Sequence, residues 1–442
     1  MSVSLSEHFT YKRLLRFVFP CIIMMIVTSI YSIVDGFFVS NCVGKNAFAA
    51  VNLIMPVLMA LSAFGFMIGT GGSALVAFTL GEGKKEKANE IFSMLILSEF
   101  LFGMLVTVVG FIFMPQIARA LGASSLIIED CVRYGRIGIL TIAFFMMQNS
   151  FQSFLVTAEQ AKMGLIVSIA CGLTNMTLDF LLVYVWPLGV TGAALATGIS
   201  ELIGAFIPLI YFMRKNKSRL RLVRPRFDAR ALRRACSNGA SEMLTNLSAS
   251  IIGMLYNMQL LKLAAENGVA AYGVIMYISF IFMAIYFGYS VGVNPVIGYH
   301  YGAGNQKELK NILKKSLVLT SIAAVVMTSA AQLLAPSLAT LFVGYDKILH
   351  DMTVNGLRLY SLVFLLCGFN IFGSAFFTGL NNGKISAIIS FLRTLVIQIA
   401  CIFILPVFLG LNGIWLSVSV AEGLTLFVTA SLLVVYRKRY GY

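Results

Sequence analysis

The chain has 442 residues, of which 59% are hydrophobic and only 12% are charged, and its mean hydropathy is +0.89. This composition excludes a protein whose whole surface is in water, because such a surface needs many more charged residues. The net charge of +15 would suit a nucleic-acid partner in a soluble protein. In a membrane protein it reports on topology instead, so we expect no nucleic-acid partner.

Apolar stretches long enough to cross a bilayer recur along the chain. A transmembrane helix needs roughly 20 mostly apolar residues. Twelve such stretches are separated by short polar or glycine-containing breaks. They lie near residues 14–40, 47–79, 91–113, 133–157, 163–186, 190–212, 237–261, 269–298, 312–336, 356–379, 385–408 and 412–436.

The basic residues predict which way the chain crosses the membrane. If the N-terminus is cytoplasmic, 25 of the 33 Lys and Arg residues fall on the cytoplasmic side, ten of them within residues 214–234. An excess of Lys and Arg marks cytoplasmic loops. We therefore predict a multi-pass protein of the cell (inner) membrane with both termini in the cytoplasm. The segment 214–234 is expected to touch anionic lipid headgroups.

The second half of the sequence repeats the first at an offset of 221 residues. Landmarks that align are Gly81-Glu82-Gly83 with Gly302-Ala303-Gly304, Pro115 with Pro336, Gly189 with Gly410, and Glu201 with Glu422. Each copy holds six helices, an even number, so both copies enter from the same side. We predict an all-α polytopic membrane protein with twelve transmembrane helices in two six-helix bundles, related by a pseudo-two-fold axis along the membrane normal. The expected division is 1–213, a basic linker 214–234, and 235–442.

Seven ionisable residues lie inside the apolar stretches, where charge is costly and therefore points to function. They are Asp35, Glu99, Asp179, Glu201, Glu242, Arg393 and Glu422. Glu201 and Glu422 occupy matching positions in the two copies, which favours a shared structural role such as hydrogen bonding between helices. Glu242 is predicted either to pair with Arg393 or to extend to water at a helix end.

Four residues of the first copy are predicted to form a cation site. Counted along their helices, Asp35, Asp179 and Thr197 all lie roughly 13 Å below the outer surface. Asn175 is one turn from Asp179 on the same helical face. Two carboxylates, an amide and a hydroxyl at one depth suit a Na⁺ ion, or a proton shared between the carboxylates.

The repeat acts as an internal control on this site. The positions that correspond to Asp35, Asn175, Asp179 and Thr197 hold Tyr256, Val396, Ala400 and Val418. The polar set therefore belongs to the first copy alone. Pro20, whose counterpart is Ser241, is expected to bend the first helix and leave one backbone carbonyl without its donor.

Helices seven and eight of the sequence carry side chains suited to a substrate cavity. Aromatic, amide and thioether groups able to line a wet, adaptable cavity recur there. The residues that we select are Tyr256, Gln259, Met276 and Tyr277.

Two motifs of the first copy resemble those of the multidrug and toxic compound extrusion (MATE) family. The first helix reads Ile33-Val34-Asp35-Gly36-Phe37-Phe38-Val39, and helix five reads Asn175-Met176-Thr177-Leu178-Asp179 before Gly189-Val190-Thr191-Gly192-Ala193-Ala194-Leu195-Ala196-Thr197. The resemblance implies a drug/cation antiporter whose coupling site matches Asp35, Asn175, Asp179 and Thr197. It also implies accessory roles for Tyr134, Gln152 and Glu242.

The resulting hypothesis is a multidrug efflux antiporter, not an enzyme, that exports amphipathic organic cations in exchange for Na⁺ or H⁺ by alternating access. It would work as a monomer and need no cofactor beyond the coupling ion. The alternative is a flippase for a lipid-linked or polyprenyl-linked precursor, which predicts a cationic cavity. A membrane receptor and an intramembrane enzyme are weaker rivals, since the sequence has no HExxH motif. A passive channel is also a weaker rival, because the polar site residues are found in one half only.

Overall fold

The computed structural model describes residues 4–38, 42–43 and 45–442, and these are helical throughout, with short turns and one extended linker. The first half contains α1 (Tyr11–Phe38), α2 (Lys45–Met67), a π-helical turn (Ile68–Gly72), α3 (Ser73–Gly81), α4 (Lys85–Ala120), α5 (Ile128–Thr157), α6 (Ala161–Asp179), a second π-helical turn (Phe180–Val185) and α7 (Val190–Met213). The second half contains α8 (Ala229–Gly302), α9 (Gln306–Val343), α10 (Lys347–Tyr360), a 3₁₀ turn (Ser361–Leu365), α11 (Cys367–Gly379), α12 (Gly383–Phe391), a π-helical turn (Leu392–Val396), α13 (Ile397–Leu409) and α14 (Leu411–Tyr440).

Twelve membrane-spanning segments follow from this order. By length and composition, 11 helical stretches among the described residues can cross a membrane. One of them, α8, has 74 residues and non-helical backbone angles at Ala264 and Ala265, so it is two helices joined by a sharp turn. The prediction of twelve transmembrane helices is thereby confirmed.

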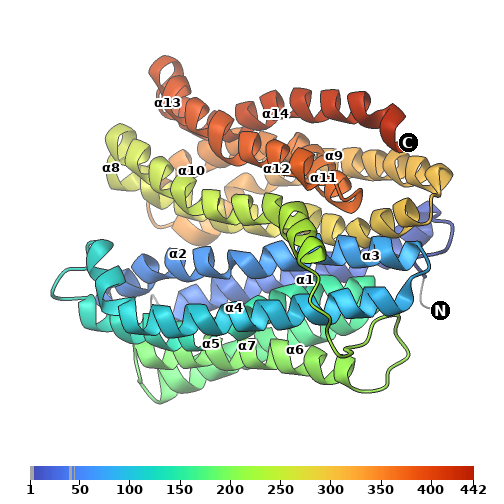
Figure 1. Cartoon of the computed structure of the whole chain (residues 1–442). Coiled ribbons are helices and arrows are strands. Elements are labelled where there is room, and N and C mark those ends of the chain that lie inside the picture. Colours follow the sequence, from blue (N-terminus) through green and yellow to red (C-terminus); the bar gives the residue numbers. More distant parts are fainter. Residues whose placement is uncertain (1–3, 39–41, 44) are drawn as a thin grey trace.

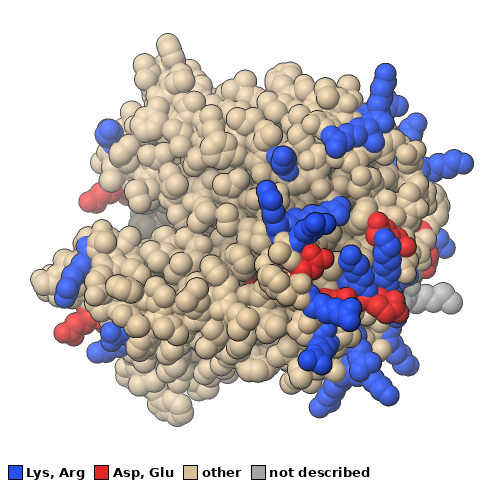
Figure 2. All heavy atoms as spheres, in the orientation of Figure 1, with Lys and Arg blue, Asp and Glu red and all other residues tan. Residues whose placement is uncertain are grey.

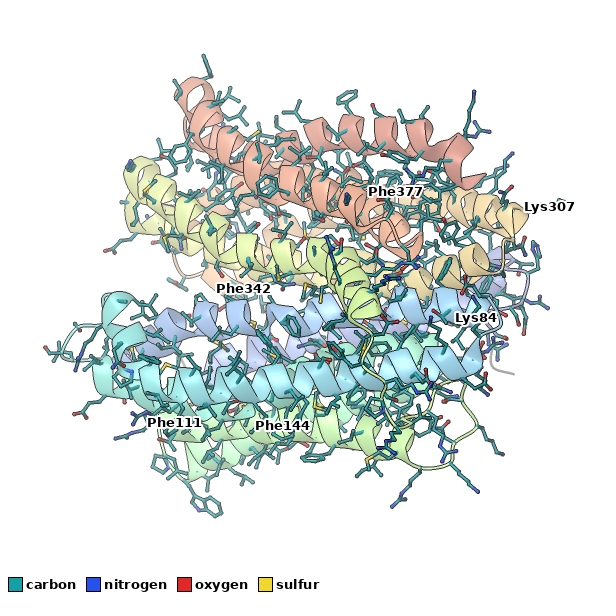
Figure 3. The ribbon with its side chains drawn as sticks, in the orientation of Figure 1. Lys84, Phe111, Phe144, Lys307, Phe342 and Phe377 are labelled. Atoms are coloured by element: carbon teal, nitrogen blue, oxygen red, sulfur yellow. The ribbon has the colours of Figure 1, made fainter. Side chains whose placement is uncertain are left out.

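The helices form two lobes stacked side by side (Figure 1). The N-lobe is built from α1 to α7 and the C-lobe from α8 to α14. Both termini lie at one end of the molecule, on the right in the figure, which we call the terminal end. Lys84, which follows α3, and Lys307, in the first turn of α9, both lie at this end, one from each lobe (Figure 3).

The backbone repeats between the lobes at the spacing found in the sequence. Gly189 has φ 61° and ψ −137°, and Gly410, 221 positions later, has φ 56° and ψ −134°. Gly83 and Gly304 share a positive φ of 79° and 67°. Only glycine adopts such angles at little cost. The matched glycines therefore fix the same turns in both lobes.

The lobes meet through close backbone contacts in the terminal half of the molecule. A methyl group added at Gly239 of α8 would collide with the carbonyl oxygen of Met67, and one added at Gly302 with that of Phe78. Gly292, also in α8, leaves room for Val18 of α1. At the opposite end, Figure 2 shows a notch between the lobes. The molecule is thus closed at the terminal end and parted at the other.

The segment before α1 adds to this closure. Leu5 and Phe9 are fully buried. The backbone N–H of Leu5 donates to Glu159 of the N-lobe at 2.7 Å, and that of Phe9 donates to Glu308 of the C-lobe at 2.9 Å. His8 also pairs with Glu308 at 2.7 Å. One short segment therefore fastens both lobes together.

The linker between the lobes is non-helical, with bends, from Arg214 until α8 begins at Ala229, so the basic segment 214–234 is partly helical. It packs along α4, where the N–H of Arg221 donates to Asn89 at 3.0 Å and that of Val223 donates to Ser93 at 2.8 Å. Lys and Arg gather at the same end of the molecule (Figure 2).

We expect Gly239→Ala to destabilise the closed terminal end by about 1–3 kcal/mol, because the new methyl group has no space. Gly253→Ala is the matched control, since it lies on the same helix and nothing surrounds its missing Cβ within 4 Å. Thermal unfolding of the detergent-purified proteins checks this. Equal melting temperatures for the two variants would contradict it.

Candidate cation and substrate site

One cavity of about 280 Å³ lies inside the N-lobe, between α1, α2, α5, α6 and α7. Part of its wall is apolar and soft, made by methionine, leucine and phenylalanine side chains. The remainder is polar and includes two acids, Asp35 and Glu201. Among the described lining residues, none is Lys, Arg or His, so the two acids face the cavity without a basic side chain beside them.

Oxygen atoms without hydrogen-bond partners gather at one side of this cavity. Asp35 lies within hydrogen-bonding range of Asp179 and Asn175. Yet Asp35 Oδ1, Asn175 Oδ1 and both carboxylate oxygens of Asp179 accept no hydrogen bond from the described residues. Two ionised carboxylates repel each other, so this close approach is stable only when a proton is shared between them or a cation joins them.

Local backbone features place these side chains. Asp179 is the last residue of α6, directly before the π-helical turn, an irregularity frequent at functional sites. Gly189 then turns the chain into α7 with its positive φ, and Thr197 follows two turns later. Gly172 lacks a side chain where Tyr31 of α1 packs, which lets α1 approach α6.

The four residues predicted to couple the ion are thus brought together. Asp35, Asn175 and Thr197 line the cavity, and Asp179 is fully buried beside Asp35. Thr197 Oγ1 also has no partner among the described residues. The carboxylate, amide and hydroxyl oxygens are the kind that Na⁺ accepts. No three His, Cys, Asp or Glu side chains in the described part of the chain are grouped closely enough to hold a metal ion.

The predicted accessory residues are divided between the lobes. Tyr134 is buried and lines the cavity, as does Gln152, whose amide reaches the hydroxyl of Ser168 at 3.5 Å. Pro20 lies within α1 but does not line the cavity. Glu242 belongs to α8 in the C-lobe, within electrostatic range of Arg393.

Arg393 has a different principal partner from the one considered in the sequence. Its Nε donates to Glu422 at 2.7 Å, and both side chains are more than nine-tenths buried. Asn370 donates a second hydrogen bond to the same carboxylate, also at 2.7 Å. Glu242 interacts with Arg393 only electrostatically, and the direct ion pair of Arg393 with Glu422 was not predicted, since the sequence does not show which helices are neighbours.

The residues predicted for a substrate cavity on helices seven and eight lie elsewhere. Tyr256 is fully buried, stacks on Tyr272 and hydrogen-bonds the hydroxyl of Ser417. Gln259 and Met276 are partly buried in the C-lobe, and Tyr277 is exposed with its hydroxyl near Gly36 of α1. These four residues do not line the N-lobe cavity. Their role in substrate binding stays a prediction.

Several cavity residues were not singled out in the sequence. They include Tyr31, Thr141, Gln148 and Asn149. Glu201, which the sequence analysis assigned a shared structural role, also lines the cavity. Helical spacing contained the signal, because Glu201 lies one turn after Thr197 and Gln148 one turn before Gln152. Searching each predicted site helix for further polar residues on the same face would have found them.

The fold and this cavity together define a class: multi-pass membrane transporters built from two six-helix lobes. A family model described as MatE matches residues 20–181 and again residues 242–404, once in each lobe. The chain therefore belongs to the MatE family of multidrug and toxic compound extrusion transporters, and it is not an enzyme.

Individual relatives agree with this assignment. The chain is 25% identical over 432 residues to the multidrug export protein MepA of Staphylococcus aureus (strain NCTC 8325 / PS 47), covering 97% of this chain and 94% of that protein. In fold it is similar to a multidrug resistance MATE family transporter of the MOP superfamily in an outward-facing conformation, with a TM-score of 0.92 at 24% identity, covering 100% of this chain and 98% of that one.

A further structural neighbour is a MOP superfamily transporter from Pyrococcus furiosus Vc1 (DSM3638). Its TM-score is 0.91 at 23% identity, with 100% of this chain and 98% of that chain covered. That transporter is described as having a binding pocket of reverse polarity, which suggests a different function for it. At this identity the likeness concerns the fold alone.

We expect Arg393→Met to destabilise the protein by about 3–5 kcal/mol, because it leaves Glu422 buried and unpaired. Replacing both partners, Arg393→Met with Glu422→Gln, should recover most of that loss. Unfolding can be followed with a thiol-reactive dye, since Cys131 and Cys367 are buried in the folded state. A double variant no more stable than the single one would contradict the pairing.

Proposed function

We propose that this transporter exports amphipathic organic cations in exchange for Na⁺ or H⁺, using the N-lobe cavity. The observation that carries the proposal is the set of unpartnered oxygens on Asp35, Asn175, Asp179 and Thr197 beside an apolar, acidic cavity. An acidic site attracts cations, and methionine-rich walls adapt to many shapes. The name of the relative MepA, a multidrug export protein, supports the same direction of transport.

The captured conformation would be the one open to the outside. The basic terminal end is the cytoplasmic side by the distribution of Lys and Arg, as the sequence predicts. The lobes are closed there and parted at the opposite end. This proposal includes four further statements. The chain is divided into 1–213, 214–234 and 235–442, both termini are cytoplasmic, the linker contacts anionic headgroups, and the protein is a monomer.

Coupling would arise from competition within one lobe. An ion or proton between Asp35 and Asp179 joins α1 to α6. A transported organic cation is attracted by the same carboxylates, so the two compete. Inward movement of the ion and outward movement of the compound then alternate, because each biases the arrangement of the N-lobe helices. Na⁺ and H⁺ are both chemically suited to the pair.

A flippase for a lipid-linked precursor is the rival function. Phosphate groups need a cationic cavity, and the described lining of this one contains two acids and no base. The buried Arg393 does not supply that charge, since it is already paired with Glu422. Cavity polarity therefore favours the export of cations.

Asp179→Asn should abolish gradient-driven efflux while leaving folding intact, because the amide cannot exchange a proton and weakens Na⁺ binding. The readout is ethidium accumulation in cells that express each variant at matched membrane levels. Glu99→Gln is the control: Glu99 is a fully buried acid outside the cavity, held by the hydroxyl of Ser150 at 2.6 Å. Efflux at the wild-type rate from Asp179→Asn would exclude Asp179 from coupling.

A further inference from the structure

Glu201 lies one helical turn beyond Thr197 on α7, toward the terminal end and the inner part of the cavity. Its Oε2 is enclosed and has no hydrogen-bond partner among the described residues, and Thr141 of α5 lies in hydrogen-bonding range. Glu201, Asp35 and Asp179 do not form one group able to hold a metal ion. Glu201 therefore does not join Asp35 and Asp179 in one set of ligands, although it lies within electrostatic range of Asp35.

Gln148 of α5 provides independent evidence for a binding position beside Glu201. Its side chain is only 5% exposed and lines the cavity, and its Oε1 has no partner in the described part of the chain. It packs against Gly204, three residues after Glu201 on α7, where an added methyl group would overlap its amide. Two enclosed acceptors thus face the inner cavity without a donor, an arrangement that costs free energy until a cation or donor arrives.

The C-lobe shows what neutralises the equivalent acid. Glu422 corresponds to Glu201 at the repeat offset, and it is paired with the guanidinium of Arg393 at 2.7 Å. Asn370, which donates to Glu422, corresponds to Asn149, which lines the N-lobe cavity. The position that corresponds to Arg393 is Gly172. The N-lobe keeps the acid and the amide but lacks the fixed organic cation.

We infer that Glu201, together with the amide oxygen of Gln148, holds the positively charged group of the transported compound, at a position separate from the coupling pair. This inference rests on the proposed export of organic cations. In the C-lobe the guanidinium of Arg393 neutralises the matching acid, Glu422. The wall of the N-lobe cavity includes Tyr31 and Phe145, whose rings suit an amphipathic cation.

The test measures binding of tetraphenylphosphonium to the full-length protein in detergent by isothermal titration calorimetry, with no gradient present. Glu201→Gln should raise Kd about 30-fold, the change that corresponds to a loss of about 2 kcal/mol for one partner of a buried charge pair. Glu201→Asp should recover part of the affinity. Glu99→Gln, a buried acid outside the cavity, should bind as the wild type does.

A second titration separates substrate binding from coupling. Adding Na⁺ or lowering the pH should still weaken binding in Glu201→Gln, and this effect should vanish in Asp179→Asn. The inference is overturned if Glu201→Gln binds normally, if it loses only the ion effect, or if the wild type binds no tetraphenylphosphonium. Binding that depends on Glu201 without any gradient-driven efflux would sink the proposed antiport and leave this inference standing.

Discussion

A carboxylate inside a membrane protein has to be neutralised, because an unpaired charge away from water costs several kcal/mol. Outside the N-lobe cavity, two enclosed acids meet this demand with fixed groups: Glu422 with Arg393 and Asn370, and Glu308 with His8 and the N–H of Phe9. Glu99 accepts the hydroxyl of Ser150 on one oxygen, and its other oxygen has no partner among the described residues. The N-lobe cavity differs because three such acids lie in it or beside it: Asp35, Asp179 and Glu201 each keep an oxygen without a partner in the described part of the chain. In the proposed function, a mobile cation or proton supplies the missing partner in this lobe.

The helix that carries Asp35 also forms the boundary between the lobes. Near its middle, α1 meets α8, where Gly288 leaves room for the backbone of Ile22 and Gly292 leaves room for Val18. Asp35 lies further along the same continuous helix, three residues before α1 ends at Phe38. A cation that joins α1 to α6 therefore acts on an element that both lobes share. This gives the proposed coupling a physical route from ion binding to lobe movement.

Much of the fold could be predicted from the sequence for two reasons. The bilayer thickness fixes the length of each apolar stretch that forms a transmembrane helix, and the repeat shows that the helices follow the same order in both halves. Helical spacing also placed Asp35, Asn175, Asp179 and Thr197 at one depth, and the structure gathers them around one cavity. The sequence could not show which helices lie side by side at a given depth. Depth alone could not show that Arg393 lies against Glu422 rather than Glu242, nor that the basic linker packs along α4.

The matched acids of the repeat illustrate a subtler difficulty. The matching positions of Glu201 and Glu422 suggested one shared structural role, yet their surroundings differ. Glu422 is paired with the guanidinium of Arg393, whereas Glu201 faces a cavity that also contains Asp35. The difference depends on Gly172, which stands where the C-lobe has Arg393. A comparison of the two halves is therefore informative only when the partners of each residue are compared as well.

The central claim is that cation chemistry in the N-lobe drives transport. Its most direct test reconstitutes the protein in liposomes and measures ethidium transport under an imposed Na⁺ gradient and, separately, under an imposed pH gradient. We expect at least one gradient to drive transport of the dye against its own concentration gradient, and Asp179→Asn to abolish this transport. Transport that responds to neither gradient, or that is unchanged in Asp179→Asn, would contradict the account.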